Sequence, residues 1–334
     1  MAPDPMSQDW LDLINEPIVD PDLEIVDPHH HLWHDLGVMG QYLLDELRAD
    51  TGSGHRVTKT VFVECGSEYR TEGPEHLRPV GETEFVADVA EASRDGGGAV
   101  ISGIVAHADL RDDRLDEVLD AHEAAGRGLF RGIRHALSSA RHPDELLIPG
   151  GAPPDLSTSA DFRRGVAALG DRGLSYDTWH YHHQMADFIE LARAVPGTTM
   201  VLDHFGTPLG VGSFAGQRDE IFEHWCDDID EVAACPNVVL KAGGMAMPDN
   251  GYGWHERDRP PDSDEFVEVQ GDWYRHAIDA FGPDRVMFES NFPVDRLSLP
   301  YAVYWNAVKK ITASFDDDAR AQMFRGTASR VYRL

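Results

Sequence analysis

Eight short runs of β-branched and other apolar residues recur along the chain, and segments with helical spacing separate them. The runs begin at Glu24, Thr58, Ala99, Gly128, Gly173, Thr198, Asn237 and Arg285. Several are apolar up to their last residues, which is typical of strands buried on both faces of a sheet. The segments from Gly81 and Met185 have the spacing of amphipathic helices. This strand–helix–strand repetition predicts a parallel sheet with right-handed crossovers.

Eight such units predict an α/β fold of the (β/α)8 TIM-barrel type. A doubly wound open sheet is the alternative, but no G-x-G-x-x-G motif follows the first run. A barrel of roughly 250 residues with inserted loops forms one domain. We therefore assign residues 24–334 to the barrel and residues 1–23 to an N-terminal arm. Two stretches that follow strands, 138–161 and 248–265, are predicted loop insertions on the face that holds the carboxyl ends of the strands.

The composition excludes several classes of function. The formal net charge of −30 argues against binding to nucleic acids or anionic membranes, because both need a basic protein surface. The chain has no run of about 18 apolar residues, and its N-terminus lacks the pattern of a secretory signal. The three cysteines form no C-x-x-C pair. A reducing cytoplasm is therefore the expected location.

The N-terminal arm carries Trp10, Leu11 and Ile14. We expect these large apolar side chains to pack on the barrel or on a second subunit. A homodimer is therefore one prediction, and a small-molecule substrate is the other expected partner.

The strongest local signal is the sequence VDPHHHLW, which closes the first run. Side chains at positions i and i+2 of a strand point the same way. His29 and His31 can therefore face one point in the barrel mouth, while His30 points elsewhere. Two imidazoles so placed can bind one metal ion, or one proton and a substrate oxygen. The sixth run ends in LDHFG and delivers His204 to the same face.

Other strand ends carry candidates for substrate binding. They are Glu64 and Tyr69 after the second run, Arg134 at the end of the fourth, Trp179 and His183 after the fifth, and Lys241 at the end of the seventh. Arg134 is suited to holding a substrate carboxylate through two parallel hydrogen bonds, although a salt bridge to a protein carboxylate is the competing interpretation. The eighth run, MFESNFPVD, brings Glu289, Asn291 and Asp295.

These motifs resemble those of the amidohydrolase-2 family of metal-dependent hydrolases, within the amidohydrolase superfamily. The likeness rests on DPHHH, GIRH, the YD…HQ run, VLDHFG and SNFP, and it extends from about Glu24 to the C-terminus. It is strongest to the L-fuconolactonases and the 2-pyrone-4,6-dicarboxylate lactonases. The resemblance implies a TIM barrel with metal or substrate histidines at His29, His31 and His204. It also implies a divalent metal, usually zinc, although some lactonases of the family work without one.

The chain departs from the family pattern at one position of the eighth strand. An aspartate in an S-D-x-P motif is the general base in these enzymes, whereas here the motif reads S-N-F-P, with Asn291 in that place. An amide has no lone pair basic enough to accept a proton at pH 7. We expect Glu289 or Asp295 to take over, or a chemistry that needs no carboxylate there. Loss of an anionic ligand also weakens metal binding.

Three functional hypotheses follow from these residues. The leading one is hydrolysis of a small, acidic lactone or carboxylic ester in carbon-source catabolism, with Arg134 anchoring a substrate carboxylate and Trp179 and Tyr69 forming apolar walls. The second is metal-dependent, non-oxidative decarboxylation of an aromatic or enoic acid, which fewer motifs support. The third is a non-catalytic small-molecule binder. The predicted catalytic set is His29, His31, His204, Glu289, Asn291 and Asp295.

Overall fold

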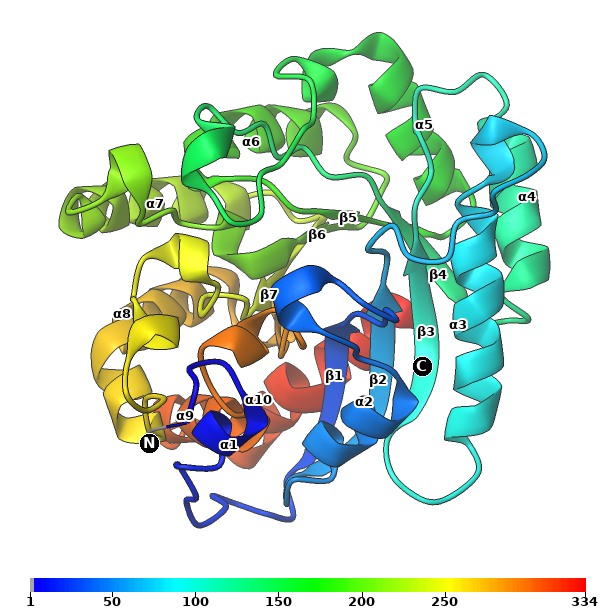
Figure 1. Ribbon diagram of the computed structural model, residues 1–334. Helices are drawn as coiled ribbons and strands as arrows, with labels where there is room; N and C mark the ends of the chain where they lie inside the picture. The colour runs from blue at the N-terminus through cyan, green and yellow to red at the C-terminus, as the bar shows by residue number, and fades with distance from the viewer. Residues whose placement is uncertain (1–2) are drawn as a thin grey trace.

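The eight predicted strands form one parallel sheet in the computed structural model, which describes residues 3–334 (Figure 1). The strands are β1 (Glu24–His30), β2 (Arg56–Val63), β3 (Val100–Ala106), β4 (Phe130–Arg134), β5 (Ser175–Thr178), β6 (Met200–Leu202), β7 (Val238–Ala242) and β8 (Val286–Phe288). They are hydrogen-bonded in sequence order, and each neighbouring pair is parallel. The chain is therefore a (β/α)8 TIM barrel, as predicted.

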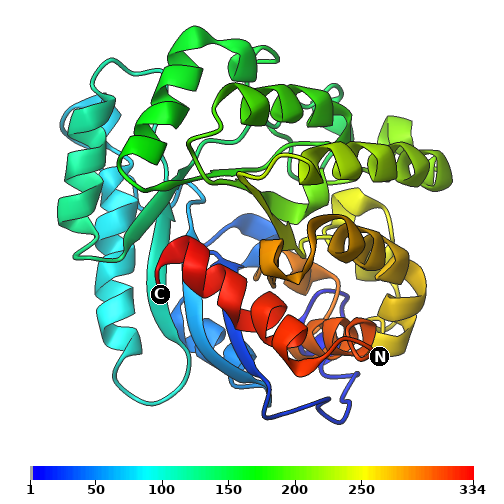
Figure 2. The same cartoon turned by 180° about the vertical axis from the view of Figure 1, so that it is seen from behind.

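Helices lie outside the strands, with their apolar faces against the sheet (Figures 1 and 2). The α-helices are α1 (Gln8–Leu11), α2 (Leu44–Thr51), α3 (Val80–Ser93), α4 (Leu115–Ala125), α5 (Ala160–Asp171), α6 (Met185–Ala194), α7 (Arg218–Ala233), α8 (Ser263–Phe281), α9 (Tyr301–Ile311), α10 (Asp317–Ala321) and α11 (Thr327–Tyr332). The two segments with clear helical spacing became α3 and α6. In Figure 2 the red C-terminal helices cross the rear end of the barrel, so the site must open on the side seen in Figure 1.

The barrel closes between β8 and β1 without a regular ladder. Among the described residues, one parallel bridge, between His30 and Phe292, joins the two sides. The His31 N–H donates to the Phe292 carbonyl at 2.9 Å, and the Asn291 N–H donates to the His29 carbonyl at 3.1 Å. These contacts lie past the end of β8. The seam of the barrel is therefore at the level of the first-strand histidines.

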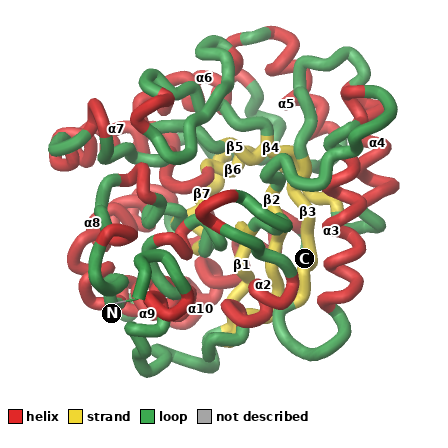
Figure 3. Tube along the Cα trace, viewed as in Figure 1, coloured by secondary structure: helices red, strands yellow, loops and turns green. Residues whose placement is uncertain are grey.

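Loops cover the face that carries the carboxyl ends of the strands (Figure 3). Both predicted insertions lie there, and they contain short helical turns at Pro143–Glu145, Leu156–Thr158, Pro248–Asn250 and Trp254–Glu256. Asp249 ties the two insertions together, because its carboxylate accepts the N–H groups of Leu147 and Ile148 at 2.8 and 2.9 Å. The loops that shape the pocket mouth are thus held by specific contacts.

The N-terminal arm packs on its own barrel. The Trp10 side chain is fully buried, and its indole N–H donates to the Arg257 carbonyl at 2.8 Å. Leu11 is also buried, and Ile14 is partly buried against the same core. These contacts fill the apolar side of the arm within one chain, and the homodimer stays a prediction. In the described part of the chain, no helix combines the length and the apolar character needed to cross a membrane.

Candidate active site

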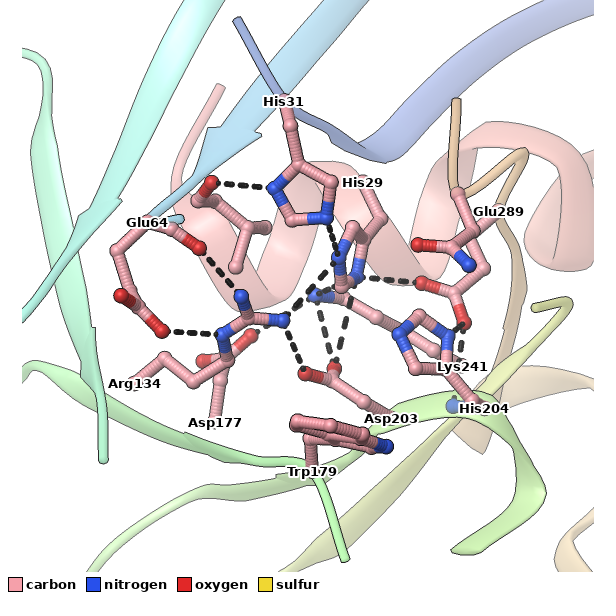
Figure 4. A network of polar contacts seen from close by, with 12 residues as sticks. His29, His31, Glu64, Arg134, Asp177, Trp179, Asp203, His204, Lys241 and Glu289 are labelled. Atoms are coloured by element: carbon pink, nitrogen blue, oxygen red, sulfur yellow. Dashed lines mark hydrogen bonds and ion pairs between the residues drawn. The ribbon is translucent and has the colours of Figure 1, made fainter. Parts of the chain in front are cut away.

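Polar side chains from seven of the eight strand ends converge in the barrel mouth (Figure 4). The group includes His29, His31, Glu64, Arg134, Asp177, Asp203, His204, Lys241 and Glu289. As the two-residue strand period predicts, His29 and His31 face each other, and their Nε2 atoms lie 3.3 Å apart. His30 points away and contacts the Thr60 hydroxyl at 3.1 Å. The predicted meeting of imidazoles from separate strands is present, since the rings of His29 and His204 lie 4.6 Å apart.

Each of the three imidazoles has an acceptor beside its Nδ1 atom. The Val63 carbonyl lies 2.8 Å from His31 Nδ1. The two oxygens of Glu289 lie 2.7 Å from Nδ1 of His29 and 2.7 Å from Nδ1 of His204. An acceptor at Nδ1 places the proton there and leaves the lone pair on Nε2, as in His31 and His204. His29 differs, because the Lys241 ammonium also lies 3.3 Å from its Nδ1 and can donate to it. Burial lowers the pKa of all three rings, to about 3 for His204, so they are neutral near pH 7.

Glu289 is thus the shared carboxylate behind two of the histidines. It is fully buried, and burial raises its pKa to about 8, while Lys241 and the His204 backbone N–H act in the opposite direction. It does not line the pocket itself. Glu289 therefore orients His29 and His204, and its carboxylate can stabilise a positive charge on either ring. It is not placed to touch a substrate directly.

Below His29 lies a buried cluster that the sequence analysis identified only in part. Lys241 Nζ lies 3.0 Å from Asp177, 3.1 Å from Asp203 and 3.3 Å from His29 Nδ1. Burial alone would lower the pKa of Lys241, but Asp203 and Asp177 hold it above its ordinary value. Lys241 was predicted to bind substrate, yet it is fully buried beneath the histidines and does not line the pocket. Its position is instead that of a counter-ion within the barrel.

Arg134 lines the pocket, but protein groups already surround its guanidinium. Its Nε donates to Glu64 at 2.8 Å, and one Nη donates to the Glu64 carbonyl. The other Nη lies 3.4 Å from His29 Nε2 and 3.7 Å from Asp203. This geometry matches the competing interpretation of a salt bridge to a protein carboxylate. It does not favour Arg134 as the anchor of a substrate carboxylate.

Asn291 and Asp295 form a pair at the seam of the barrel. The Asn291 amide donates to Asp295 at 2.9 Å, and the Ala246 N–H donates to the other Asp295 oxygen at 3.0 Å. Burial raises the pKa of Asp295 to about 8, although the contact with Asn291 lowers it. Asn291 lines the pocket, whereas Asp295 is buried behind it. Asp295 is therefore no better placed than Glu289 to take a proton directly from water in the pocket.

The pocket is a cavity of about 310 Å³ above these groups. His31, Glu64, Arg134, His204 and Asn291 line it, together with Trp179 as predicted. Two predicted substrate-binding residues lie elsewhere. Tyr69 lines a separate hollow beside His107, and His183 stacks between Tyr181 and Phe214 in another. Both follow strands, but the loops that carry them turn outward from the barrel axis.

The donor set fits a divalent metal ion, and zinc is an ion that imidazoles suit. His29 Nε2 and His31 Nε2 lie 3.3 Å apart. Two ligands of a tetrahedral zinc at about 2.0–2.1 Å are separated by roughly this distance. A second group, His29, His204 and Glu289, has ligand atoms within 4.8 Å of one another. Because Glu289 is hydrogen-bonded to His204 Nδ1 at 2.7 Å, we favour the Nε2 atoms of His29 and His31 as the ligands, with His204 and Glu289 beside them.

The backbone after β6 and β7 is shaped to place His204. His204 and Phe205 have positive φ angles of 55° and 58°, which turn the chain sharply after a strand of three residues. Gly244, with φ +67°, lies against the His204 ring, and a Cβ atom there would meet its Nδ1 at 2.1 Å. The second glycine of the AGGM sequence at the end of β7 is therefore required by the structure. Glycine is needed because the imidazole occupies that space.

Sequence reasoning missed the roles of Asp177 and Asp203. Both were visible as acidic residues at the ends of apolar strands, YD in the fifth run and LD in the sixth. A carboxylate at the end of a buried strand needs a partner. That signal could have paired them with Lys241, the one lysine at a strand end.

Comparisons with known proteins agree with this geometry. The amidohydrolase family model matches residues 26–334. An uncharacterized protein of Sinorhizobium fredii is 32% identical over 94% of this chain and 99% of its own. An L-fucono-1,5-lactonase of Burkholderia multivorans is 31% identical over 76% of this chain and 77% of its own.

A crystal structure of an amidohydrolase from Burkholderia multivorans, with bound zinc, has a TM-score of 0.72 at 25% identity and covers 93% of this chain and 99% of its own. A 5-carboxyvanillate decarboxylase from Sphingomonas paucimobilis, at 12% identity and a TM-score of 0.54, covers 93% of this chain and 99% of its own and shares the fold alone.

Proposed function

The chain belongs to the amidohydrolase family, and from that premise we propose that this hydrolase opens a small lactone or a related carboxylic ester. The observation that carries the proposal is the group of three neutral imidazoles, His29, His31 and His204, at the floor of the barrel mouth. An acceptor faces Nδ1 of His31 and of His204, and these two rings line a cavity where a carbonyl and a water molecule can lie together. The lactonase name of the Burkholderia multivorans relative supports this class of substrate.

His204 is the side chain best placed to move a proton. It lines the pocket, and Glu289 holds its Nδ1 in the same way that a carboxylate orients the base of a catalytic triad. His204 Nε2 would take the proton from water and later return it to the alkoxide that leaves. Glu289 would stabilise the imidazolium formed in between. This assignment explains how hydrolysis can proceed with Asn291 in the place of the usual carboxylate.

The Arg134 guanidinium lines the pocket and would face the carbonyl oxygen, where negative charge develops. A zinc ion held by Nε2 of His29 and His31 would supply the Lewis acidity that polarises this carbonyl, and it would leave the Nε2 lone pair of His204 free to accept the proton. Because the guanidinium of Arg134 is engaged by Glu64, we propose that the substrate itself is neutral. The expectation of an acidic substrate depended on a free Arg134.

Acid release from a panel of lactones and esters, measured with a pH indicator, tests the proposal. We expect His29→Ala and His31→Ala to lose turnover by orders of magnitude, because both imidazoles would hold the ion that stabilises the developing charge. His183→Ala is the control, since this histidine lies on the same face but in a separate hollow. Unchanged rates in the two strand variants would end the proposal.

The panel, extended by aromatic acids, addresses the alternatives. Binding of a lactone without acid release would indicate a non-catalytic binder, and carbon dioxide release from an aromatic acid would indicate a decarboxylase. Metal content of the purified protein, measured by elemental analysis, should fall in His29→Ala and His31→Ala and stay at the wild-type level in His183→Ala.

A further inference from the structure

The pocket is divided by depth into a polar floor and apolar walls. The polar lining residues come from strand ends: His31, Glu64, Arg134, His204 and Asn291. The larger apolar residues follow the strands and include Trp33, Leu36, Met39, Ile148, Trp179, Met247 and Val294. A bound molecule would place its reacting carbonyl on the floor, and the rest of it would touch the walls.

The two tryptophans present apolar faces to this cavity. The Trp33 indole N–H donates to the Gly40 carbonyl at 2.9 Å, and the Trp179 indole N–H donates to the Thr207 hydroxyl at 3.0 Å. An indole has one hydrogen-bonding group. Both are therefore already satisfied by the protein, and neither ring can receive a substrate hydroxyl.

The polar floor has little capacity left for hydroxyl groups. One Glu64 oxygen accepts from Arg134, and the Asn291 NH2 group donates to Asp295. Among the described residues no hydrogen bond reaches the other Glu64 oxygen or the Asn291 carbonyl oxygen, so these two acceptors remain for hydroxyl groups. The remaining lone pairs belong to the imidazoles at the reaction centre. A sugar ring carries a hydroxyl on most of its carbons, and each hydroxyl that loses water without gaining a partner costs about 1–3 kcal/mol.

A loop over the pocket mouth adds to the apolar walls. It runs from Trp33 to Tyr42, and an antiparallel bridge between these two residues closes it at its base, with both N–H···O distances at 2.9 Å. Leu36, on this loop, is 47% exposed and still lines the cavity. An apolar ligand would cover this exposed leucine, and a polyhydroxylated one would not benefit from it.

We infer that the substrate is a lactone or ester that carries an alkyl or aryl group, and that a polyhydroxylated sugar lactone is a poor substrate. The inference rests on the proposed function and narrows its substrate class. The cavity of about 310 Å³ is roughly twice the 150 Å³ cavity that holds benzene in an engineered protein core. It has room for a lactone ring and an apolar substituent of similar size.

The experiment compares δ-nonalactone, unsubstituted δ-valerolactone and L-fucono-1,5-lactone as substrates of the intact protein. We expect kcat/KM to be at least about tenfold higher for δ-nonalactone than for the sugar lactone, because its butyl group gains burial. A higher kcat/KM for L-fucono-1,5-lactone would overturn this inference and leave the lactonase proposal standing.

Calorimetric titration separates the two ideas if no lactone is hydrolysed. That result would refute the proposed function. Binding of δ-nonalactone with a negative heat-capacity change, and no binding of L-fucono-1,5-lactone, would still support an apolar ligand site. Preferential binding of the sugar lactone, or no binding of either, would overturn it.

A matched pair of variants tests the loop. Leu36→Asn should raise KM for δ-nonalactone about fivefold, since half a leucine side chain loses its apolar contact, and should raise KM for δ-valerolactone by a smaller factor. Leu13→Asn is the control, because Leu13 is 48% exposed and does not line the cavity. Equal effects of the two substitutions, or no effect of Leu36→Asn, would contradict the role of the loop.

Discussion

At the scale of single residues, Glu289 links the first and sixth strands through one carboxylate. Its two oxygens each lie 2.7 Å from an imidazole Nδ1, on His29 and on His204. Lys241 and the His204 backbone N–H favour the ionised form, whereas burial favours the protonated form and raises the pKa to about 8. Only the ionised form can accept from both rings, so the tautomers of both histidines depend on this one side chain and on a pH above about 8.

Glu289→Gln is expected to disable the site without unfolding the barrel. Its amide can accept from one imidazole only, because its NH2 group must donate to the other, whose proton then moves to Nε2. A wrong tautomer in a catalytic triad lowers kcat by about 10⁴, and we expect a loss of about 10²–10⁴ here. Turnover and circular dichroism measure the two effects, and retention of more than about a tenth of kcat would refute the tautomer argument.

Asp295 gives a prediction about pH. Its pKa is about 8 in the folded protein and 3.8 without burial. The folded state therefore holds a proton that the unfolded state has lost between these pH values, so stability falls as the pH rises from about 4 to about 8. In Asp295→Asn, where Asn291 can flip its amide to keep the contact, the loss of stability that comes from this carboxyl group should be absent. The melting temperature of both proteins across this range is the measurement, and parallel curves would contradict the raised pKa.

At the scale of elements, strand ends deliver side chains and the turns that follow decide where they point. Gly244 illustrates this, because a Cβ atom there would meet the His204 ring at 2.1 Å. Gly253 also has a positive φ, but a Cβ atom at that position would meet no described atom within 4 Å. Both glycines therefore face the same backbone penalty on substitution, and only one of them touches the site.

Gly244→Ala should lose most of its activity, whereas Gly253→Ala should keep it. Each substitution costs about 1–2 kcal/mol, because alanine is strained in a left-handed conformation. Only the first also displaces His204. Thermal denaturation and lactone turnover of the two variants separate the effects. Similar activity in both would show that His204 can move aside without consequence.

The strand period predicted where the three imidazoles lie, and the geometry of the loops could not be read from the sequence. His29, His31 and His204 follow from strand ends alone, because the carboxyl ends of parallel strands meet at one face. Tyr69 could not be excluded, because the positive φ of 53° at Glu68, which helps to turn that loop, leaves no clear mark in the sequence. The partners of Lys241 lie on other strands, and contacts across the barrel interior are not encoded by local spacing.

At the scale of the whole molecule, the net charge of −30 would act differently on the substrate and on the product of the proposed hydrolysis. A neutral lactone would enter without electrostatic cost, whereas the hydroxy acid that leaves would be an anion. A negatively charged protein repels an anion over about 30 Å at 0.01 M salt and about 3 Å at 1 M salt. The overall charge would therefore promote product release without hindering substrate entry.

Product inhibition should accordingly depend on salt. We expect the inhibition constant of the hydroxy acid to fall, meaning tighter binding, between 0.01 M and 1 M sodium chloride, because screening removes the repulsion. The KM of a neutral lactone serves as the internal control and should change little. Initial rates at several product concentrations provide both values. A salt-independent inhibition constant would indicate that local charges outweigh the overall field.

At the seam between β8 and β1, the same residues close the barrel and carry side chains of the candidate site. The two main-chain hydrogen bonds that complete the cylinder involve the backbone of His29 and His31, whose side chains belong to the candidate site. Any fluctuation that unzips the cylinder at this joint also separates the reacting groups. Closure of the barrel and the placement of the site histidines therefore depend on the same hydrogen bonds. Amide hydrogen exchange at His31 and Asn291 would report on both.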